Sequence, residues 1–100
     1  MCGIIGYTGK REASEIMLDA LELLEYRGYD SAGIALFPEK GGPVRIFKKA
    51  GRVHDLRELC AKNDVTGHCG IGHTRWATHG EPSDINSHPH GNKRVSIVHN

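Results

Sequence analysis

Apolar residues recur along the chain with two different periods, and each period predicts a type of secondary structure. In residues 11–25 and 53–62 the period is three to four residues, which is typical of helices that bury one face. The inward positions are Ala13, Ile16, Met17, Ala20, Leu21 and Leu24 in the first helix, and Val53, Leu56, Leu59 and Cys60 in the second. Gly28 is placed to end the first helix, because glycine is favoured just after a helix end.

Short apolar or alternating runs predict strands between and around these helices. The predicted strands cover residues 2–7, 31–37, 44–49, 65–74 and 94–99. Residues 38–43 hold two glycines and two prolines and predict a hairpin loop, whereas the polar segment 78–92 predicts a long functional loop. The resulting order is strand, helix, hairpin, helix, strand, loop, strand, which indicates one domain with a layered α+β architecture.

Composition narrows the class of protein without naming a function. The chain has 100 residues, 38% hydrophobic and 25% charged, with a formal net charge of +1. This balance favours neither a nucleic acid nor a membrane partner, and the short basic run of Lys48, Lys49 and Arg52 is interpreted as a solvated face. The three cysteines form no disulfide framework, and no signal peptide is visible, so we expect a cytoplasmic protein.

Cys2 is the first candidate for chemistry. If Met1 is removed, which is usual before a small residue, Cys2 carries a thiol and an α-amine on the same residue. A thiol titrates near ~8.5 and an α-amine near ~7.7–8, so the amine can accept a proton as the sulfur attacks a carbonyl carbon. Gly3 and Gly6 leave the neighbouring backbone open to a substrate. The alternative is that Cys2 simply begins a buried strand.

Three further strings carry side chains suited to a hydrolytic site. They are Arg27-Gly28-Tyr29-Asp30-Ser31-Ala32-Gly33, His73-Thr74-Arg75-Trp76-Ala77-Thr78-His79-Gly80-Glu81-Pro82 and Val98-His99-Asn100. Together with Cys2, and in this order along nearly the whole chain, they resemble the class II glutamine amidotransferases, a family of N-terminal-nucleophile hydrolases. Within that family they are most similar to the branch that delivers ammonia to fructose 6-phosphate.

The resemblance implies a role for each matching residue. Cys2 would be the nucleophile, and the amide of Asn100 would stabilise the oxyanion formed from the glutamine carboxamide. Arg75 would bind the α-carboxylate of glutamine, which suits the bidentate fork of a guanidinium. The remaining matches are Thr78 and His79 lining the same pocket, Trp76 in the loop that closes over glutamine and gates the ammonia channel, and Arg27 and Gly3 supporting the nucleophile.

The same resemblance implies a fold and a larger context. The fold would be a four-layer αββα sandwich, of which residues 1–100 would be the N-terminal part of one glutaminase domain. Ammonia from glutamine would convert fructose 6-phosphate to glucosamine 6-phosphate on sugar isomerase domains that are not among these residues. The strand pattern runs to Asn100 without a turn, so we expect a longer polypeptide, which the family suggests is a homo-oligomer.

Two alternatives remain open at this point. The chain could be a catalytically incomplete folding or assembly module, since the family's second oxyanion donor and its α-ammonium ligand would lie beyond Asn100. A metal module is disfavoured, because the histidine and cysteine clusters match neither a zinc-ribbon nor a metalloprotease spacing, and we expect no cofactor. The histidines are His54, His68, His73, His79, His88, His90 and His99, and Cys60 and Cys69 are interpreted as packed thiols.

Overall fold

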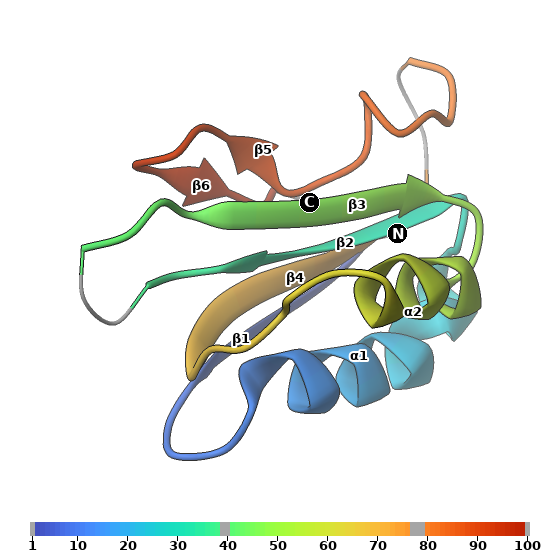
Figure 1. Ribbon diagram of the computed structural model, residues 1–100. Coiled ribbons are helices and arrows are strands. Elements are labelled where there is room, and N and C mark those ends of the chain that lie inside the picture. Colours follow the sequence, from blue (N-terminus) through green and yellow to red (C-terminus); the bar gives the residue numbers. More distant parts are fainter. Residues whose placement is uncertain (1, 39–40, 77–79, 100) are drawn as a thin grey trace.

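The computed structural model describes residues 2–38, 41–76 and 80–99, and it has the mixed α+β architecture expected from the sequence (Figure 1). The elements are β1 (Gly3–Thr8), α1 (Ala13–Leu24), the 3-10 turn η1 (Glu25–Arg27), β2 (Ser31–Leu36), β3 (Arg45–Ala50), α2 (Val53–Ala61), β4 (Cys69–Arg75), β5 (His90–Gly91) and β6 (Ser96–Ile97). Both predicted helices and the hairpin that joins β2 to β3 are confirmed.

The main sheet has the order β1-β4-β2-β3, and every pair of neighbouring strands in it is antiparallel. The central strand β4 therefore separates β1 from β2, although it comes much later in the sequence. The register pairs Gly3 with Thr74 and Ser31 with Arg75. Because of this pairing, the first residues of β1 and β2 lie next to the last residues of β4, at one end of the sheet.

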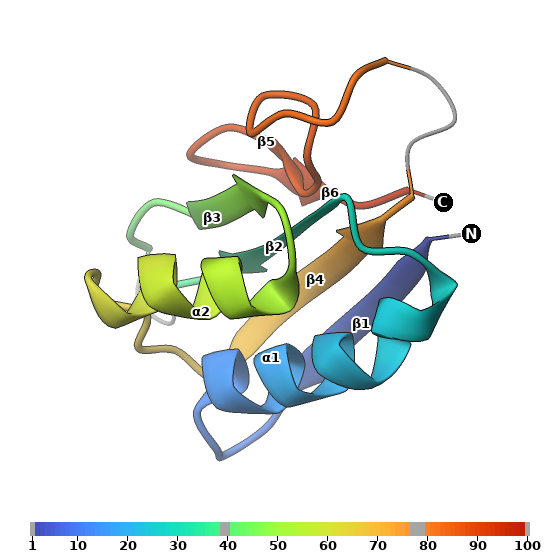
Figure 2. The same ribbon diagram turned by 90° about the vertical axis from the view of Figure 1, so that its right-hand side faces the viewer.

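Both helices cover one face of the sheet and bury the core between themselves and the strands (Figure 2). Of the predicted inward positions, Ala13, Met17, Leu21, Val53, Leu56 and Cys60 are buried, whereas Ile16, Ala20, Leu24 and Leu59 are only partly buried. Leu18, which was not predicted, is also buried, and β2 is buried along its whole length. The buried core residues are Ala13, Met17, Leu18, Leu21, Ala32, Ile34, Leu36, Val53, Leu56 and Cys60. Within the described ranges, neither helix is long and apolar enough to cross a membrane.

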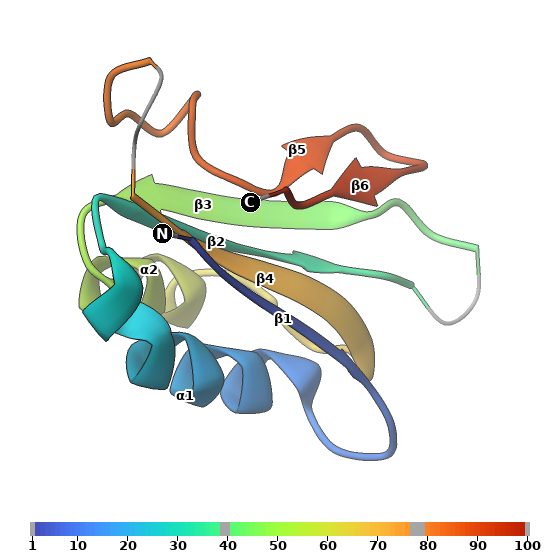
Figure 3. The ribbon, with the colours of Figure 1, turned by 180° about the vertical axis from the view of Figure 1, so that it is seen from behind.

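The opposite face of the sheet carries the C-terminal segment, including the small β5–β6 hairpin, which lies over β3 (Figures 1 and 3). Gly33 on β2 permits this close approach, since a Cβ there would lie 2.1 Å from the carbonyl oxygen of His88 and 2.9 Å from Cδ of Pro89. The β1 side of this face is less covered, and Ile4 is 46% exposed. The described residues thus form one helical layer, one four-stranded sheet and one two-stranded sheet.

Two strand predictions were too long. The strand expected over 94–99 pairs only at Ser96 and Ile97, because its partner β5 offers only two residues and Val95 lies in the intervening turn. The strand expected over 65–74 begins at Cys69, because the preceding residues form a turn in which the carboxylate of Asp64 accepts the backbone N–H of Thr66 at 3.1 Å.

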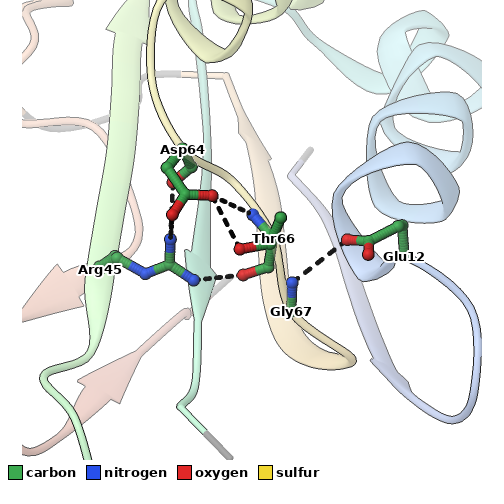
Figure 4. A network of polar contacts seen from close by, with 5 residues as sticks. All are labelled: Glu12, Arg45, Asp64, Thr66 and Gly67. Atoms are coloured by element: carbon green, nitrogen blue, oxygen red, sulfur yellow. Dashed lines mark hydrogen bonds and ion pairs between the residues drawn. The ribbon is translucent and has the colours of Figure 1, made fainter.

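A polar network fixes the end of the sheet from which β4 starts (Figure 4). Arg45 on β3 donates to the carbonyl oxygen of Asp64 at 2.6 Å and to that of Thr66. Asp64 also accepts the Thr66 hydroxyl at 2.7 Å, and Glu12 accepts the N–H of Gly67 at 3.2 Å. The network joins β3, the loop before β4 and the start of α1, so it fixes where the central strand enters the sheet.

Candidate active site

Cys2 lies directly before β1, at the end of the sheet where β4 finishes. Since Gly3 pairs with Thr74, continuing the register by one residue brings Cys2 next to Arg75. The thiol is half-buried and takes no part in a disulfide. The structure therefore brings two of the predicted site residues together, although they are far apart in the sequence.

Gly3 supports this position by packing rather than by chemistry. A Cβ at Gly3 would lie 2.8 Å from the Thr74 hydroxyl and 2.9 Å from Cβ of Leu24, so only glycine fits under α1. Successive residues of a strand point to opposite faces. Because Gly3 and Thr74 face α1, Cys2 and Arg75 are directed to the face without helices.

Arg75 is held at the end of β4 from both sides. Its carbonyl oxygen accepts the N–H of Asp30 at 2.9 Å, which ties it to the start of β2. Its guanidinium Nη1 donates to the carbonyl oxygen of Glu81 in a long hydrogen bond of 3.4 Å. The side chain is half-buried, and a carboxylate on this face could engage the same guanidinium.

Trp76 and the Arg27 string form the wall of a cavity of about 530 Å³ beside this end of the sheet. Trp76 is 50% exposed, contacts Gly28, and meets the ring of Tyr29 edge-on with centroids 6.3 Å apart. A Cβ at Gly28 would lie 2.3 Å from Cβ of Trp76, and its φ of 146° is one that other residues rarely adopt. Arg27 lines the same cavity, as does Arg52, whose guanidinium stacks over Tyr29 at 4.5 Å.

Three histidines stack on the same face of the sheet. His73 of β4 is stacked on His88 at 4.3 Å between ring centroids, and His88 meets His90 at 4.4 Å. Desolvation, with smaller contributions from the nearby cationic groups, lowers the pKa of His88 to about 4, and burial lowers the pKa of His73 and of His90 as well. The stack is therefore uncharged near neutral pH.

His73 also contacts His99, the last described residue. Its Nε2 lies 2.8 Å from the carbonyl oxygen of His99. Three predicted site residues, Thr78, His79 and Asn100, lie outside the described residues. The segment that leads to Asn100 thus passes over β4 close to the candidate site.

No group of three or more histidine, cysteine or acidic side chains suited to a metal ion is present in the described part of the chain. Two histidines that lie close together in the sequence, His68 and His73, are separated along β4 and do not form one site. His68 contacts the carbonyl oxygen of Arg11 at 2.9 Å at one end, whereas His73 belongs to the stack described above.

Sequence reasoning missed two residues next to the site, Lys48 and Asn86. The interpretation of Lys48 as part of a solvated face is wrong, since its half-buried ammonium donates to the carbonyl oxygens of Ile85 and Ser87 at 3.3 and 3.0 Å. Asn86 donates to the Glu81 carbonyl oxygen at 2.9 Å. Neither has a local sequence signal, because both act through pairing between segments distant in the chain.

Comparison with known proteins shows the class of protein that the chain resembles. Over its whole length it is similar to glutamine-dependent aminotransferases, although no family model matches it. The relatives are named glutamine–fructose-6-phosphate aminotransferase [isomerizing]. Identity is 55% to the protein of Clostridium acetobutylicum, 58% to that of Bacillus subtilis and 59% to that of Halalkalibacterium halodurans. Each match covers 100% of this chain and 16% of the relative. The resemblance expected from the motifs is confirmed, and the chain spans about a sixth of the relatives' length.

Proposed function

We propose that this chain carries the glutamine-hydrolysing site of an isomerising glutamine–fructose-6-phosphate aminotransferase. The observation that carries the proposal is the register of β1 against β4, which by extension places Cys2 next to Arg75 at the end where β4 finishes. Trp76, which follows Arg75, lines a cavity together with Arg27. A nucleophile and a carboxylate-binding cation on the same face are what the hydrolysis of glutamine requires. The relatives support the same function through their name.

In the proposed reaction, the Cys2 sulfur attacks the carboxamide carbon of glutamine while its α-amine takes the thiol proton. Collapse of the tetrahedral intermediate breaks the carbon–nitrogen bond, and the proton passes to the departing nitrogen, which leaves as ammonia. Water then attacks the thioester, releasing glutamate and restoring the thiol. The α-amine is available only after Met1 has been removed.

Arg75 orients the substrate by pairing its guanidinium with the α-carboxylate of glutamine. By resemblance, the amide of Asn100 donates to the oxyanion, and Thr78 and His79 line the pocket. Trp76 is proposed to gate the passage of ammonia, which its half-exposed ring at the cavity supports. Arg27 and Gly3 support the nucleophile, Gly3 by letting β1 lie close against α1.

For the whole protein we propose that the ammonia converts fructose 6-phosphate to glucosamine 6-phosphate on further domains. The complete glutaminase domain would be a four-layer sandwich in which a second sheet covers the less protected β1 side of the open face, where Ile4 is 46% exposed. A cytoplasmic homo-oligomer remains the expectation for the natural polypeptide.

The test is covalent trapping with a diazoketone analogue of glutamine, followed by peptide mass spectrometry of the natural polypeptide. We expect the label on the sulfur of Cys2, in a protein whose chain begins at Cys2. Labelling at another residue would overturn the assignment of the nucleophile. Full glutaminase activity in protein that retains Met1 would overturn the role of the α-amine.

A further inference from the structure

The segment Gly80–Ser87, which follows Trp76 along the chain, is fastened to the edge strand β3. The Lys48 ammonium donates to the carbonyl oxygens of Ile85 and Ser87 at 3.3 and 3.0 Å, and it contacts Nδ1 of His90 at 3.4 Å. A few residues away, the backbone N–H of Ala50 donates to the Asp84 carboxylate at 2.7 Å. One strand thus holds this segment by a side-chain cation and by its own backbone.

The fastened segment has a compact internal structure. The Ser87 hydroxyl donates to the Ser83 carbonyl oxygen at 2.6 Å, and the Ser83 hydroxyl accepts the N–H of Asn86 at 3.1 Å. These bonds fix the backbone from which the Asn86 carboxamide projects. That carboxamide donates through Nδ2 to the carbonyl oxygen of Glu81 at 2.9 Å.

The Glu81 carbonyl oxygen has a second donor, which is Nη1 of Arg75 at 3.4 Å. The Arg75 guanidinium also lies near Gly80, where a Cβ would come within 3.6 Å of Nη2 and 3.3 Å of the Asn86 amide nitrogen. Asn86 and Arg75 therefore meet at one carbonyl group. The orientation of that carbonyl group decides which N–H of the guanidinium it engages.

From this arrangement we infer that Asn86 is a positioning residue for Arg75, and that Lys48 holds in place the segment that carries Asn86. The inference rests on the proposed function, in which Arg75 binds the α-carboxylate of glutamine. A guanidinium has five N–H donors in a rigid fork. With one of them directed to the Glu81 carbonyl oxygen, the plane of the fork that meets a carboxylate is set.

The energetic reason lies in the flexibility of arginine. A long side chain loses much rotamer freedom when it is ordered, and a binding group that is already ordered does not incur that loss when the ligand arrives. Removing the Asn86 donor should loosen the Glu81 carbonyl group and so weaken its hold on the plane of the Arg75 guanidinium. Binding of the carboxylate is then weakened, whereas the attack by Cys2 on bound substrate is little affected.

The test measures glutaminase kinetics of the natural polypeptide with Asn86→Ala, Asn86→Ser and Lys48→Met. We expect the KM for glutamine to rise about tenfold in the Asn86 variants with kcat within about threefold of the parent, which is the pattern of lost uniform binding. Lys48→Met should raise KM less, and Lys48→Arg should restore part of the loss. Matched controls are Asn63→Ala, which removes an amide-to-carbonyl bond at the end of α2, and Lys62→Met on the exposed surface.

A second measurement separates positioning of Arg75 from general damage to the fold. The inhibition constant of glutamate should rise in parallel with KM, because glutamate keeps the α-carboxylate. That of 4-aminobutanamide, which is glutamine without the α-carboxylate, should not change. An unchanged KM in both Asn86 variants, or equal weakening of both inhibitors, would overturn the inference while leaving the proposed function intact. Absence of glutaminase activity in the parent protein would overturn both.

Discussion

The two ends of the main sheet are built from similar residue types but differ in how fully their polar groups are hydrogen-bonded. At the end where β4 starts, Arg45, Asp64 and Thr66 bond to one another and to the backbone, and Glu12 closes the network. At the end where β4 finishes, the deeply buried His73 has an Nδ1 atom with no hydrogen-bond partner among the described residues. At the first end, called the closed end below, the polar groups bond to one another and hold the fold together. The second end, called the open end, retains polar groups that do not hold the fold together.

The same contrast holds for the two cysteines of the neighbouring strands. Cys69 begins β4 opposite Thr8, at the closed end, and Cys2 precedes β1 at the open end. Both thiols are half-buried, so burial alone does not distinguish them. What distinguishes them is the neighbouring chemistry, namely Arg75, which the register of β1 and β4 places next to Cys2.

The largest effect should come from removing the thiol at the open end. Cys2→Ala in the natural polypeptide should lower the glutaminase kcat by at least about 10³-fold, since removal of a covalent nucleophile has effects of this size or larger. Glutamate release from glutamine measures it directly. Cys69→Ala is the matched control and should leave kcat unchanged. Equal losses in the two variants would show that the two ends do not differ as described.

The next effect concerns the cation at the open end. Arg75→Ala should raise the KM for glutamine by about 10²-fold, because it removes a charge-assisted bidentate pair. Arg75→Lys should recover only part of this loss, since an ammonium lacks the planar fork. Steady-state kinetics with glutamine as the varied substrate measure both. An unchanged KM in Arg75→Ala would remove the residue from carboxylate binding.

The sequence predicted elements better than their arrangement. The apolar period identified α1 and α2 because it reflects which helix face is buried, and the glycines and prolines of 38–43 identified the hairpin. The position of β4 between β1 and β2 is a long-range pairing that no local period encodes. The same reason hid Lys48 and Asn86, whereas Cys2 and Arg75 were found because their chemistry is visible in short strings.

A smaller effect is expected at the closed end, where a substitution should lower stability without changing glutamine binding. Arg45→Met removes two hydrogen bonds to backbone carbonyl oxygens, and we expect about 1 kcal/mol less stability toward urea. The KM for glutamine should not change, because Arg45 lies at the opposite end of the sheet from Arg75. Arg94→Met, at an exposed position, is the control for loss of a positive charge. A rise in KM comparable to that of Arg75→Ala would contradict the separation of the two ends.

The last prediction concerns the acid stability of the histidine stack at the end where β4 finishes. His88 has a pKa of about 4 in the folded chain against an ordinary value of 6.5, so between these pH values the unfolded state binds more protons. Stability contributed by the neutral ring is therefore present above about pH 6.5 and is lost as the pH falls toward about 4. Partial exposure of the ring limits the contribution to about 1–2 kcal/mol.

His88→Phe keeps an aromatic ring beside His73 and removes the titrating group. Urea unfolding of the natural polypeptide between pH 4.5 and 7 should show a weaker pH dependence in this variant than in the parent. The neighbouring His73 and His90, whose pKa values burial also lowers, should retain part of the slope. Leu23→Phe on the exposed side of α1 adds a phenyl ring without removing a titrating group, so it is the control, and its slope should match the parent. An undiminished slope in His88→Phe would mean that the acid sensitivity arises elsewhere than in the stack over β4.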